Sequence, residues 1–342
     1  MSAATGIFNE SNNLCSVIQM SWHDINHTTQ LQHTFDVPSH PSHHATNPLK
    51  HIQPVYNTIR YDHTGTYILC GGTQRTPVLY NTNTMKLIQS YDNTIHGYSI
   101  LDLAISHDST TFVTCGIDKY IVQWDTTTNQ CISKLRSFTE LQLNSIQYNY
   151  NSQCVVTGGN DTNVYIFDNK QYKSSKPISI LTDATDNINS ISLDDHMMGT
   201  AGNDGVVRLY DIRMGRLIQD YILQSITSLQ INHQYILCSC TDNTCKLFNI
   251  YNNELIHSLN QHQHQQYKIQ SSMDYGNKYI YTGSEDNNVY RYSILSHDTA
   301  VQPIHQAAIL SSHHNIVHVT ACNPINNQLA TASLDGTLKL WN

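Results

Sequence analysis

The sequence predicts an all-β protein, a single seven-bladed β-propeller in which four-stranded antiparallel sheets stand around a central axis. Two observations lead to this prediction. Residues 96–135 contain four short runs of β-prone residues separated by polar turns, and one such sheet has too little core to be stable alone. Similar segments recur along the chain at intervals of roughly 40 residues, a period typical of propeller blades.

Three linked positions mark the repeat. An Asp stands in the turn after the second run, a Thr stands four residues before most of these Asp residues, and an aromatic residue follows six residues after each, as in Trp124-Asp125. The turn residues are Asp118, Asp161, Asp204, Asp242, Asp286 and Asp335. This combination is the pattern of the WD repeat.

The predicted propeller covers residues 47–342. Residues 1–46 are polar and carry no repeat, so we expect a disordered N-terminal extension there. The fourth strand of blade 6 is expected near Val301–Ile304. Blade 7 ends at Trp341, one strand short, and an open edge would leave backbone groups unpaired. We therefore expect Asn47–Ile52 to supply the missing strand and close the ring.

His96, Thr114, Asp118 and Trp124 fall where WD-repeat proteins place a buried hydrogen-bond relay. A base, a hydroxyl and a carboxylate could also form a catalytic set. However, the Thr and the Asp recur blade after blade, and buried polar groups must satisfy one another. We therefore interpret the relay as structural. One member of His262/His264, and one of His313/His314, is expected to be the relay His of its own blade.

Clusters of His and Cys are the other candidate sites of chemistry in the sequence. The chain has 20 His, including the group His40, His43 and His44, but no His is paired with Cys or carboxylates at a recurring metal spacing. Cys238, Cys240 and Cys245 are interpreted as buried thiols. No Gly-rich phosphate loop and no hydrolase motif occurs. We expect no catalytic residue, no metal and no cofactor.

Two groups of residues are candidates for binding partner proteins. The first is the densest basic group in the chain, Arg208, Arg213 and Arg216 with Met214, because Arg and exposed Met are favoured at interfaces. The second is the residue before each turn Asp, which should lie on one face of the ring near its axis. Its members are Ile117, Asn160, Asn203, Thr241, Glu285 and Leu334.

Composition limits the partners. The formal net charge is −8 with 18 Lys and Arg, so no general positive field attracts phosphate backbones and direct nucleic-acid binding is not expected. Nine Cys without a C-x-x-C pair, and no signal peptide at the start of the chain, favour a reducing compartment, the cytoplasm or the nucleus. No apolar run is long enough for a membrane span, so no membrane contact is expected.

Two segments resemble one particular family. Residues 210–227 (YDIRMGRLIQDYILQSIT) and 264–286 (HQQYKIQSSMDYGNKYIYTGSED) are similar to matching blades of the mitogen-activated protein kinase organizer family, as is His96-Gly97-Tyr98 with Leu101-Asp102. The chain departs from the pattern in blade 1, where Thr73-Gln74-Arg75 replaces the turn Asp. The resemblance implies a non-enzymatic scaffold that gathers kinases of the extracellular-signal-regulated cascade, binds a prolyl hydroxylase and accompanies the spliceosome.

Three functional hypotheses follow. The first is a protein scaffold in a MAP-kinase cascade or in pre-mRNA splicing, located in the cytoplasm and nucleus. The second is a substrate receptor or regulatory subunit of a ubiquitin ligase or another enzyme complex. The third is a propeller enzyme with its site in the central channel. The inner strands show no convergent acid, base or metal ligands in the sequence, which argues against the third hypothesis.

Overall fold

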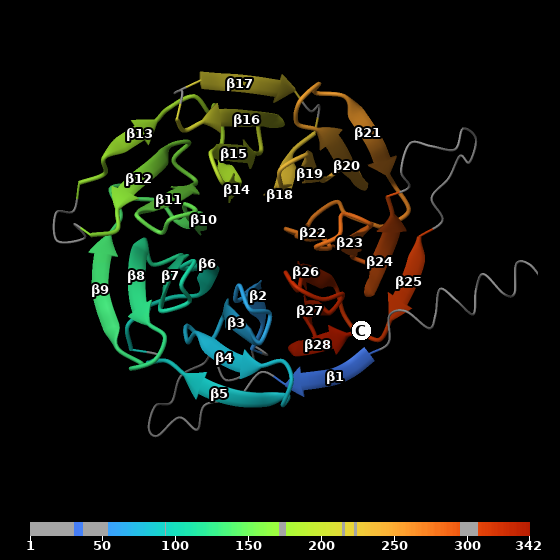
Figure 1. The fold of residues 1–342 in the computed structure, drawn as a ribbon, viewed down its shortest axis with the longest axis horizontal. Coiled ribbons are helices and arrows are strands. Elements are labelled where there is room, and N and C mark those ends of the chain that lie inside the picture. Colours follow the sequence, from blue (N-terminus) through green and yellow to red (C-terminus); the bar gives the residue numbers. More distant parts are fainter. Residues whose placement is uncertain are drawn as a thin grey trace, which may run out of the picture.

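A computed structural model of the chain describes residues 31–36, 54–92, 94–170, 176–213, 216–221, 224–294 and 307–342. These residues form seven four-stranded antiparallel sheets that stand radially around a central axis (Figure 1). None of them lies in a helix. The predicted all-β, seven-bladed propeller is therefore confirmed.

In blades 1 to 6, four consecutive strands follow one another from the axis outward. Blade 1 has β2 (Tyr56–Tyr61), β3 (Tyr67–Gly72), β4 (Val78–Asn81) and β5 (Lys86–Ser90); blade 2 has β6 (Ile100–Ile105), β7 (Thr111–Gly116), β8 (Tyr120–Asp125) and β9 (Cys131–Arg136). Blade 3 has β10 (Leu143–Tyr148), β11 (Cys154–Gly159), β12 (Val164–Asp168) and β13 (Ser179–Leu181).

Blade 4 has β14 (Ile188–Asp194), β15 (Met197–Gly202), β16 (Val206–Asp211) and β17 (Arg216–Tyr221); blade 5 has β18 (Ile226–Ile231), β19 (Tyr235–Cys240), β20 (Thr244–Asn249) and β21 (Leu255–Leu259). Blade 6 has β22 (Ser271–Met273), β23 (Tyr279–Gly283), β24 (Asn288–Ser293) and β25 (Ala308–Ser311). Blade 7 combines β26 (Val317–Cys322), β27 (Leu329–Ser333) and β28 (Thr337–Trp341) with β1 (Leu31–Asp36).

An N-terminal strand completes the last blade, but it is not the predicted one. β1 pairs antiparallel with β28, with Leu31 opposite Trp341 and Phe35 opposite Leu338 (Figure 1). Asn47–Ile52 lies outside the described residues, and the outer edge of β28 is already occupied. The sequence of β1 alternates Leu, His and Phe with Gln, Thr and Asp, which suits a strand. Pro48 lacks an N–H for such a ladder.

Two predicted boundaries change as a result. The propeller begins at or before Leu31, so residue 47 is not its start. The rest of the predicted extension, residues 1–30 and 37–46, lies outside the described residues. The fourth strand of blade 6 is Ala308–Ser311, which pairs with β24, whereas the predicted Val301–Ile304 is also outside the described residues.

The two faces of the ring carry different connections. One face carries the turns between the second and third strands of each blade and the loops that lead into each blade, and we call it the relay face. The turns between the first and second strands, and those between the third and fourth strands, lie on the opposite face. The core lies between adjacent blades. One cluster joins Val113 and Ile121 of blade 2 to Ile146 and Val155 of blade 3. Another joins β2 and β3 of blade 1 to β26, β27 and β28 of blade 7, so the closing blade is packed like the others.

A glycine at the end of the second strand is part of this architecture. The position of a Cβ on Gly116 would collide with the carbonyl oxygen of Ser99, which leads into the inner strand of the same blade. Gly202 stands in the same relation to Asn187 in blade 4. Close approach of two backbone segments therefore requires glycine immediately before the turn that carries the Asp.

Candidate interaction surfaces and the central channel

The predicted relay is present in blade 2. His96 lies in the loop before β6, Thr114 on β7, Asp118 in the next turn and Trp124 on β8. His96 Nδ1 lies 2.8 Å from Asp118 Oδ2, and His96 Nε2 lies 2.7 Å from Thr114 Oγ1. Trp124 Nε1 donates to the same hydroxyl at 3.0 Å. The relay thus connects a loop, a turn and two strands.

The relay is buried and its polar groups are used internally. The side chains of His96 and Asp118 are 0% and 4% exposed. Burial alone opposes ionisation of Asp118, but its hydrogen bond to His96 and the charge of that ring outweigh burial, so the pKa of this carboxyl lies below its ordinary value. Asp118 also accepts the backbone N–H of Gly97 at 3.1 Å. We assign the relay a structural role, because a substrate has no access to it.

Blade 7 contains a second complete relay. His313 Nδ1 lies 3.2 Å from Asp335 Oδ2, and His313 Nε2 lies 2.9 Å from Thr331 Oγ1. Trp341 Nε1 donates to that hydroxyl at 2.9 Å. Of the two candidates His313 and His314, His313 is therefore the relay residue.

Blade 6 has a modified arrangement. Here His262 Nδ1 lies 3.2 Å from the hydroxyl of Tyr292, which replaces the Trp of a complete relay. Asp286 instead accepts the hydroxyl of Tyr290 at 2.5 Å. The replacement of indole by phenol brings a new hydroxyl into the blade, and His262 bonds to it.

In blades 3 to 5, the turn Asp binds a side chain four residues later on the third strand. The pairs are Asp161 with the Tyr165 hydroxyl at 2.5 Å, Asp204 with Arg208 at 2.7 Å, and Asp242 with Lys246 at 3.3 Å. The side chains of Asp204 and Arg208 are 6% and 5% exposed. Arg208 therefore does not belong to a surface patch, because it neutralises a buried carboxylate.

The other members of the basic group are placed separately. Arg213 is exposed in the turn between β16 and β17, on the opposite face, and its backbone N–H donates to Asp211 Oδ1 at 2.9 Å. Met214 lies outside the described residues. Arg216 begins β17, and its side chain is also outside them. Arg213 remains a candidate for binding a partner, but it lies in the turn after β16, whereas Arg208 is buried within that strand.

Asn160, Asn203 and Glu285 lie in turns of the relay face, as expected. Each also bonds within the ring. Asn160 Oδ1 accepts from Asn144 at 2.7 Å, and Asn203 Oδ1 accepts from Asn189 at 2.7 Å. Glu285 accepts three consecutive backbone N–H groups, from Gln265, Gln266 and Tyr267, at 2.7 to 3.0 Å. Burial opposes ionisation of Glu285, yet these bonds lower the pKa of its carboxyl. Glu285 therefore holds a loop in place.

An exposed apolar group on the relay face was not recognised from the sequence as a unit. Tyr98, Ile117, Phe138 and Leu141 are 64%, 38%, 52% and 48% exposed. They lie in the loop before β6, the turn between β7 and β8, and the loop between β9 and β10. We call these four residues the blade 2 surface. The sequence does not predict this group, because residues in loops follow no hydrophobic periodicity. Of the four, Ile117 alone is a predicted interface residue, because it directly precedes Asp118.

Hydrogen bonds hold the three loops of the blade 2 surface together. Gly97 N–H donates to Asp118, and Ser137 N–H donates to the carbonyl oxygen of Lys119 at 2.8 Å. Glu140 lies 3.6 Å from Lys119 and 3.1 Å from Arg136. Exposed ion pairs contribute little stability alone, but here they add to backbone bonds between the loops. The three loops are therefore fixed relative to one another, and they carry the four exposed apolar side chains together with two cations and one carboxylate.

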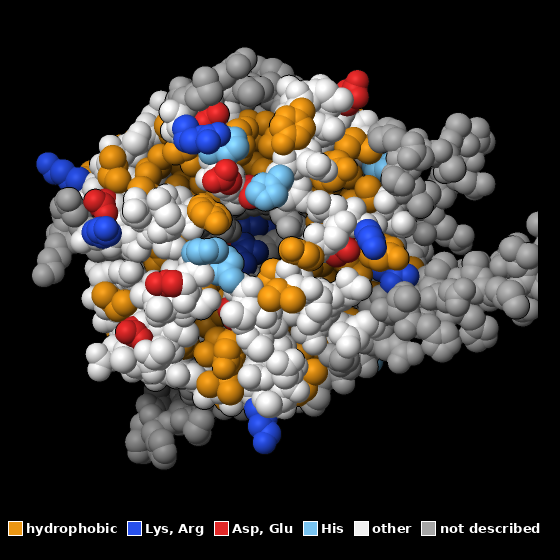
Figure 2. Space-filling view, viewed as in Figure 1, with side chains coloured by type: hydrophobic (Ala, Val, Ile, Leu, Met, Phe, Trp, Pro, Cys, Tyr) orange, Lys and Arg blue, Asp and Glu red, His pale blue; other side chains and the backbone are white. Residues whose placement is uncertain are grey.

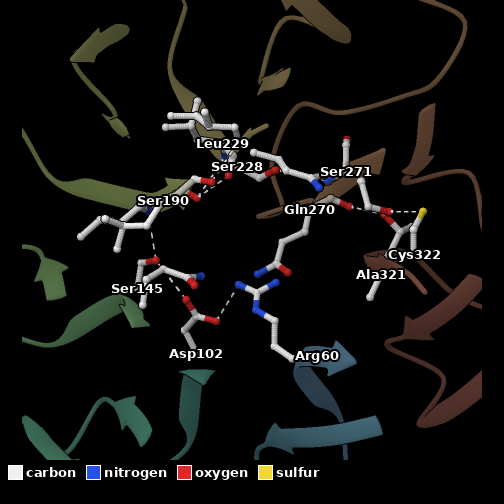
Figure 3. A pocket seen from close by; sticks show the side chains of 18 of the residues that line it. Arg60, Asp102, Ser145, Ser190, Ser228, Leu229, Gln270, Ser271, Ala321 and Cys322 are labelled. Carbon is white, nitrogen blue, oxygen red and sulfur yellow. Dashed lines mark hydrogen bonds and ion pairs between the residues drawn. The ribbon is translucent and has the colours of Figure 1, made fainter. Parts of the chain in front are cut away.

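The central channel contains a belt of polar side chains on the inner strands. Lys and Arg side chains are visible within the central hole, and His side chains gather around its mouth (Figure 2). In several blades a side chain on the inner strand accepts a backbone N–H from the next blade. The pairs are Asp102 with Ile146, Ser145 with Ile191, Ser190 with Leu229, and Ser228 with Ser271, at 3.0 to 3.2 Å. The four accepting side chains are labelled in Figure 3.

Acidic and basic groups therefore do converge on the channel, contrary to the expectation from the sequence. Asp102 Oδ1 accepts from Thr58, Arg60 and the backbone N–H of Leu103, and its Oδ2 accepts from Ser145 and Ile146. A carboxylate offers about four acceptor positions. Asp102 has no free position with which to take a proton from a substrate, so we assign it to joining blades 1, 2 and 3.

The metal hypothesis finds no site among the described residues. No group of three or more His, Cys, Asp or Glu in this part of the chain is arranged to hold a metal ion. His40, His43 and His44 are outside it. Cys238, Cys240 and Cys245 are buried and take part in no disulfide, and burial raises the pKa of Cys240 to about 12 and that of Cys245 to about 11. Thiolates are disfavoured at both positions. The described residues form no helix that could span a membrane.

Comparison with known proteins agrees with the fold. The family model of the WD domain, G-beta repeat, matches residues 86–125, 129–168 and 305–342. A WD repeat domain-containing protein 83 homolog of Dictyostelium discoideum is 30% identical over 83% of this chain and 93% of its own length. An uncharacterised WD repeat-containing protein of Schizosaccharomyces pombe is 31% identical over the same shares. The human WD repeat domain-containing protein 83 is 28% identical over 84% of this chain and 89% of its own.

Proposed function

Because the chain belongs to the WD-repeat family and, within it, to the group of WD repeat domain-containing protein 83, we propose that it is a non-enzymatic scaffold that assembles MAP-kinase cascade components or spliceosomal proteins. The blade 2 surface is the observation that supports a binding role most directly. Four exposed apolar side chains stand on loops fixed by a buried relay. Exposed apolar groups of this kind, edged by charge, are typical of protein interfaces.

The proposal that the partners belong to a kinase cascade or to the splicing machinery rests on the resemblance of residues 210–227 and 264–286 to the organizer family. On that basis the proposed partners are kinases of the cascade, spliceosomal proteins and a prolyl hydroxylase, and the proposed locations are the cytoplasm and the nucleus. The lack of a free acid or base at Asp102 supports the absence of catalysis in the channel.

The test is affinity purification of the full chain from separate cytoplasmic and nuclear extracts, followed by mass spectrometry. Kinases of the cascade in the cytoplasmic sample, or splicing proteins in the nuclear sample, are the expected result. Recovery of ubiquitin-ligase subunits in their place would contradict this proposal and support the substrate-receptor alternative. Recovery of no specific protein from either extract would refute the scaffold itself.

A further inference from the structure

The channel holds two cavities that share side chains. One cavity of about 320 Å³ is lined by Arg60, Asp102 and serines of the inner strands. A second, of about 360 Å³, is lined mainly by Asn and Gln side chains nearer the relay face. Lys268 and Gln270 line both cavities. A ligand at this level of the channel would therefore meet groups from several blades at once.

Arg60 reaches into the first cavity with part of its guanidinium unused. Its Nη2 donates to Asp102 Oδ1 at 3.1 Å and its Nε donates to the carbonyl oxygen of Leu103 at 3.3 Å. Within the described part of the chain, Nη1 has no hydrogen-bond acceptor. The side chain is 32% exposed, and it is exposed toward the cavity it lines. Arg60 therefore offers at least one N–H group to a bound acceptor.

Lys268 crosses the channel from blade 6. Its Nζ donates to the carbonyl oxygens of Asn144 at 3.1 Å and Asn189 at 2.8 Å, in blades 3 and 4. An ammonium has three N–H groups, so one remains. The side chain is exposed, but only to a channel that protein surrounds, and this desolvation lowers the pKa of Lys268. A nearby anion would replace the lost hydration.

Gln270 supplies an acceptor. The residue is 9% exposed, and its Oε1 has no hydrogen-bond partner among the described residues. Figure 3 shows its amide extending to the middle of the channel, beside the guanidinium of Arg60. A buried acceptor without a partner is costly unless water or a ligand donates to it. The site thus contains donors for an anion and an acceptor for a hydroxyl at the same level.

The charges define the sign of the ligand. Arg60 and Lys268 are cationic. Asp102, the carboxylate beside Arg60, has all of its acceptor positions occupied by groups of the ring. Asp62 also lines the first cavity, but its carboxylate accepts the backbone N–H of Tyr67 at 2.8 Å and closes its own turn. The N–H groups of Arg60 and Lys268 that have no acceptor in the described part of the ring favour an anionic ligand, and Asp62 adds one negative charge at the wall of the same cavity. The volume of about 320 Å³ admits a molecule of a few non-hydrogen atoms together with water.

We propose that this level of the channel, between Arg60, Lys268 and Gln270, binds a small organic carboxylate that also carries a hydroxyl. The carboxylate accepts from Arg60 Nη1 and the third N–H of Lys268, and the hydroxyl donates to Gln270 Oε1. Charge-assisted bonds supply most of the affinity, and the hydroxyl supplies selectivity. The inference does not depend on which proteins the ring binds.

The test is a ligand-detected NMR titration of the full chain with glycolate and with acetate at matched ionic strength. Glycolate should bind saturably, and about threefold to tenfold more tightly than acetate, as one added hydrogen bond predicts. Gln270→Leu should bind both anions equally, and Lys268→Met should bind both at least about tenfold more weakly. Lys278→Met, at an exposed lysine outside the channel, is the matched control and should bind like the unmodified chain.

Thermal unfolding of each variant shows whether it is folded. If Lys268→Met is unfolded, the comparison of glycolate with acetate in Gln270→Leu tests the proposal by itself. The proposal is overturned if glycolate binding fails to saturate. It is also overturned if Gln270→Leu keeps the preference for glycolate, or if Lys278→Met weakens binding as much as Lys268→Met does.

Discussion

At the scale of residues, the turn Asp has two tasks that explain why it recurs while its partners vary. Besides its long-range partner, it accepts the backbone N–H two residues later and so shapes the turn, as the carboxylates of Asp118 and Asp335 do for Tyr120 and Thr337. The second partner is His in blades 2 and 7 and Tyr, Arg or Lys in blades 3 to 6. The turn carries an Asp in every one of these blades, whereas the side chain that binds this Asp differs from blade to blade.

Asp118→Ala should lower the free energy of unfolding by about 1–3 kcal/mol, because it leaves His96 and Gly97 N–H without their acceptor. Asp118→Asn should cost less, because an amide oxygen can still accept from the turn. Urea unfolding followed by tryptophan fluorescence measures both. An unfolding midpoint of Asp118→Ala equal to that of the unmodified chain would remove the relay from the account.

A second prediction concerns pH. His318 joins blade 7 to blade 1 by a 2.8 Å bond from Nε2 to the carbonyl oxygen of Tyr56, and burial lowers the pKa of its ring from 6.5 to about 4. Between these values the unfolded chain binds a proton that the folded chain does not. Stability should therefore fall as the pH falls from about 6.5 to about 4, and be unaffected by this group above that window.

His318→Gln should reduce this slope, because an amide can donate to Tyr56 without titrating. His262, whose pKa is also lowered to about 4 by burial, contributes with the same sign, so part of the slope should remain. Unfolding free energies measured at intervals between pH 4 and 7 give the comparison. The same slope in both proteins would show that burial does not lower the pKa of His318.

At the scale of elements, the local pattern of apolar residues and turns predicts most strands, but it does not predict which strand pairs with the last one. The turns at Asp118 and Asp335 and the aromatic residues after them placed the inner three strands of these blades correctly. The prediction that Asn47–Ile52 closes the ring is wrong, because Leu31–Asp36 occupies the edge of β28. Pairing of Leu31–Asp36 with Thr337–Trp341 joins the two ends of the chain, and nothing in either segment alone specifies that partner. The hydrophobic pattern of an outer-edge strand specifies its pairing partner only weakly.

Removal of residues 1–36 should therefore lower the melting temperature by several degrees, whereas removal of residues 1–30 should change it little. Only the longer truncation deletes β1 and exposes the edge of β28. Differential scanning calorimetry of the two truncated chains makes the comparison. If both truncations melt at the same temperature, β1 does not close the ring.

Gly116→Ala should destabilise blade 2 by about 1–3 kcal/mol, since its Cβ would meet the carbonyl oxygen of Ser99 and the backbone must move. Gly97→Ala is the matched control, because the nearest atom to its Cβ is Asp118 Cβ at 3.9 Å, an ordinary contact. Chemical unfolding of both variants is the measurement. Equal stability of the two variants would contradict the close approach.

At the scale of the whole molecule, a residue can bind a partner only if the folded ring exposes its side chain. That exposure cannot be predicted from the sequence of these segments. Arg208 belongs to the densest basic segment yet is buried against Asp204. Phe138 and Leu141 look like core residues yet are half exposed in a loop. The groups in the channel also escaped prediction, because Arg60 and Lys268 are 208 positions apart and meet only when the ring closes.

The central claim, that the ring acts by binding proteins through the blade 2 surface, is tested most directly by quantitative affinity purification with two matched variants. One carries Ile117→Ser and Phe138→Ser on that surface. The other carries Tyr251→Ser and Ile325→Ser, which are 79% and 60% exposed on the opposite face. If the ring binds proteins through the blade 2 surface, the first variant loses a defined set of partners and the second retains them. Identical partner recovery from both variants would contradict it.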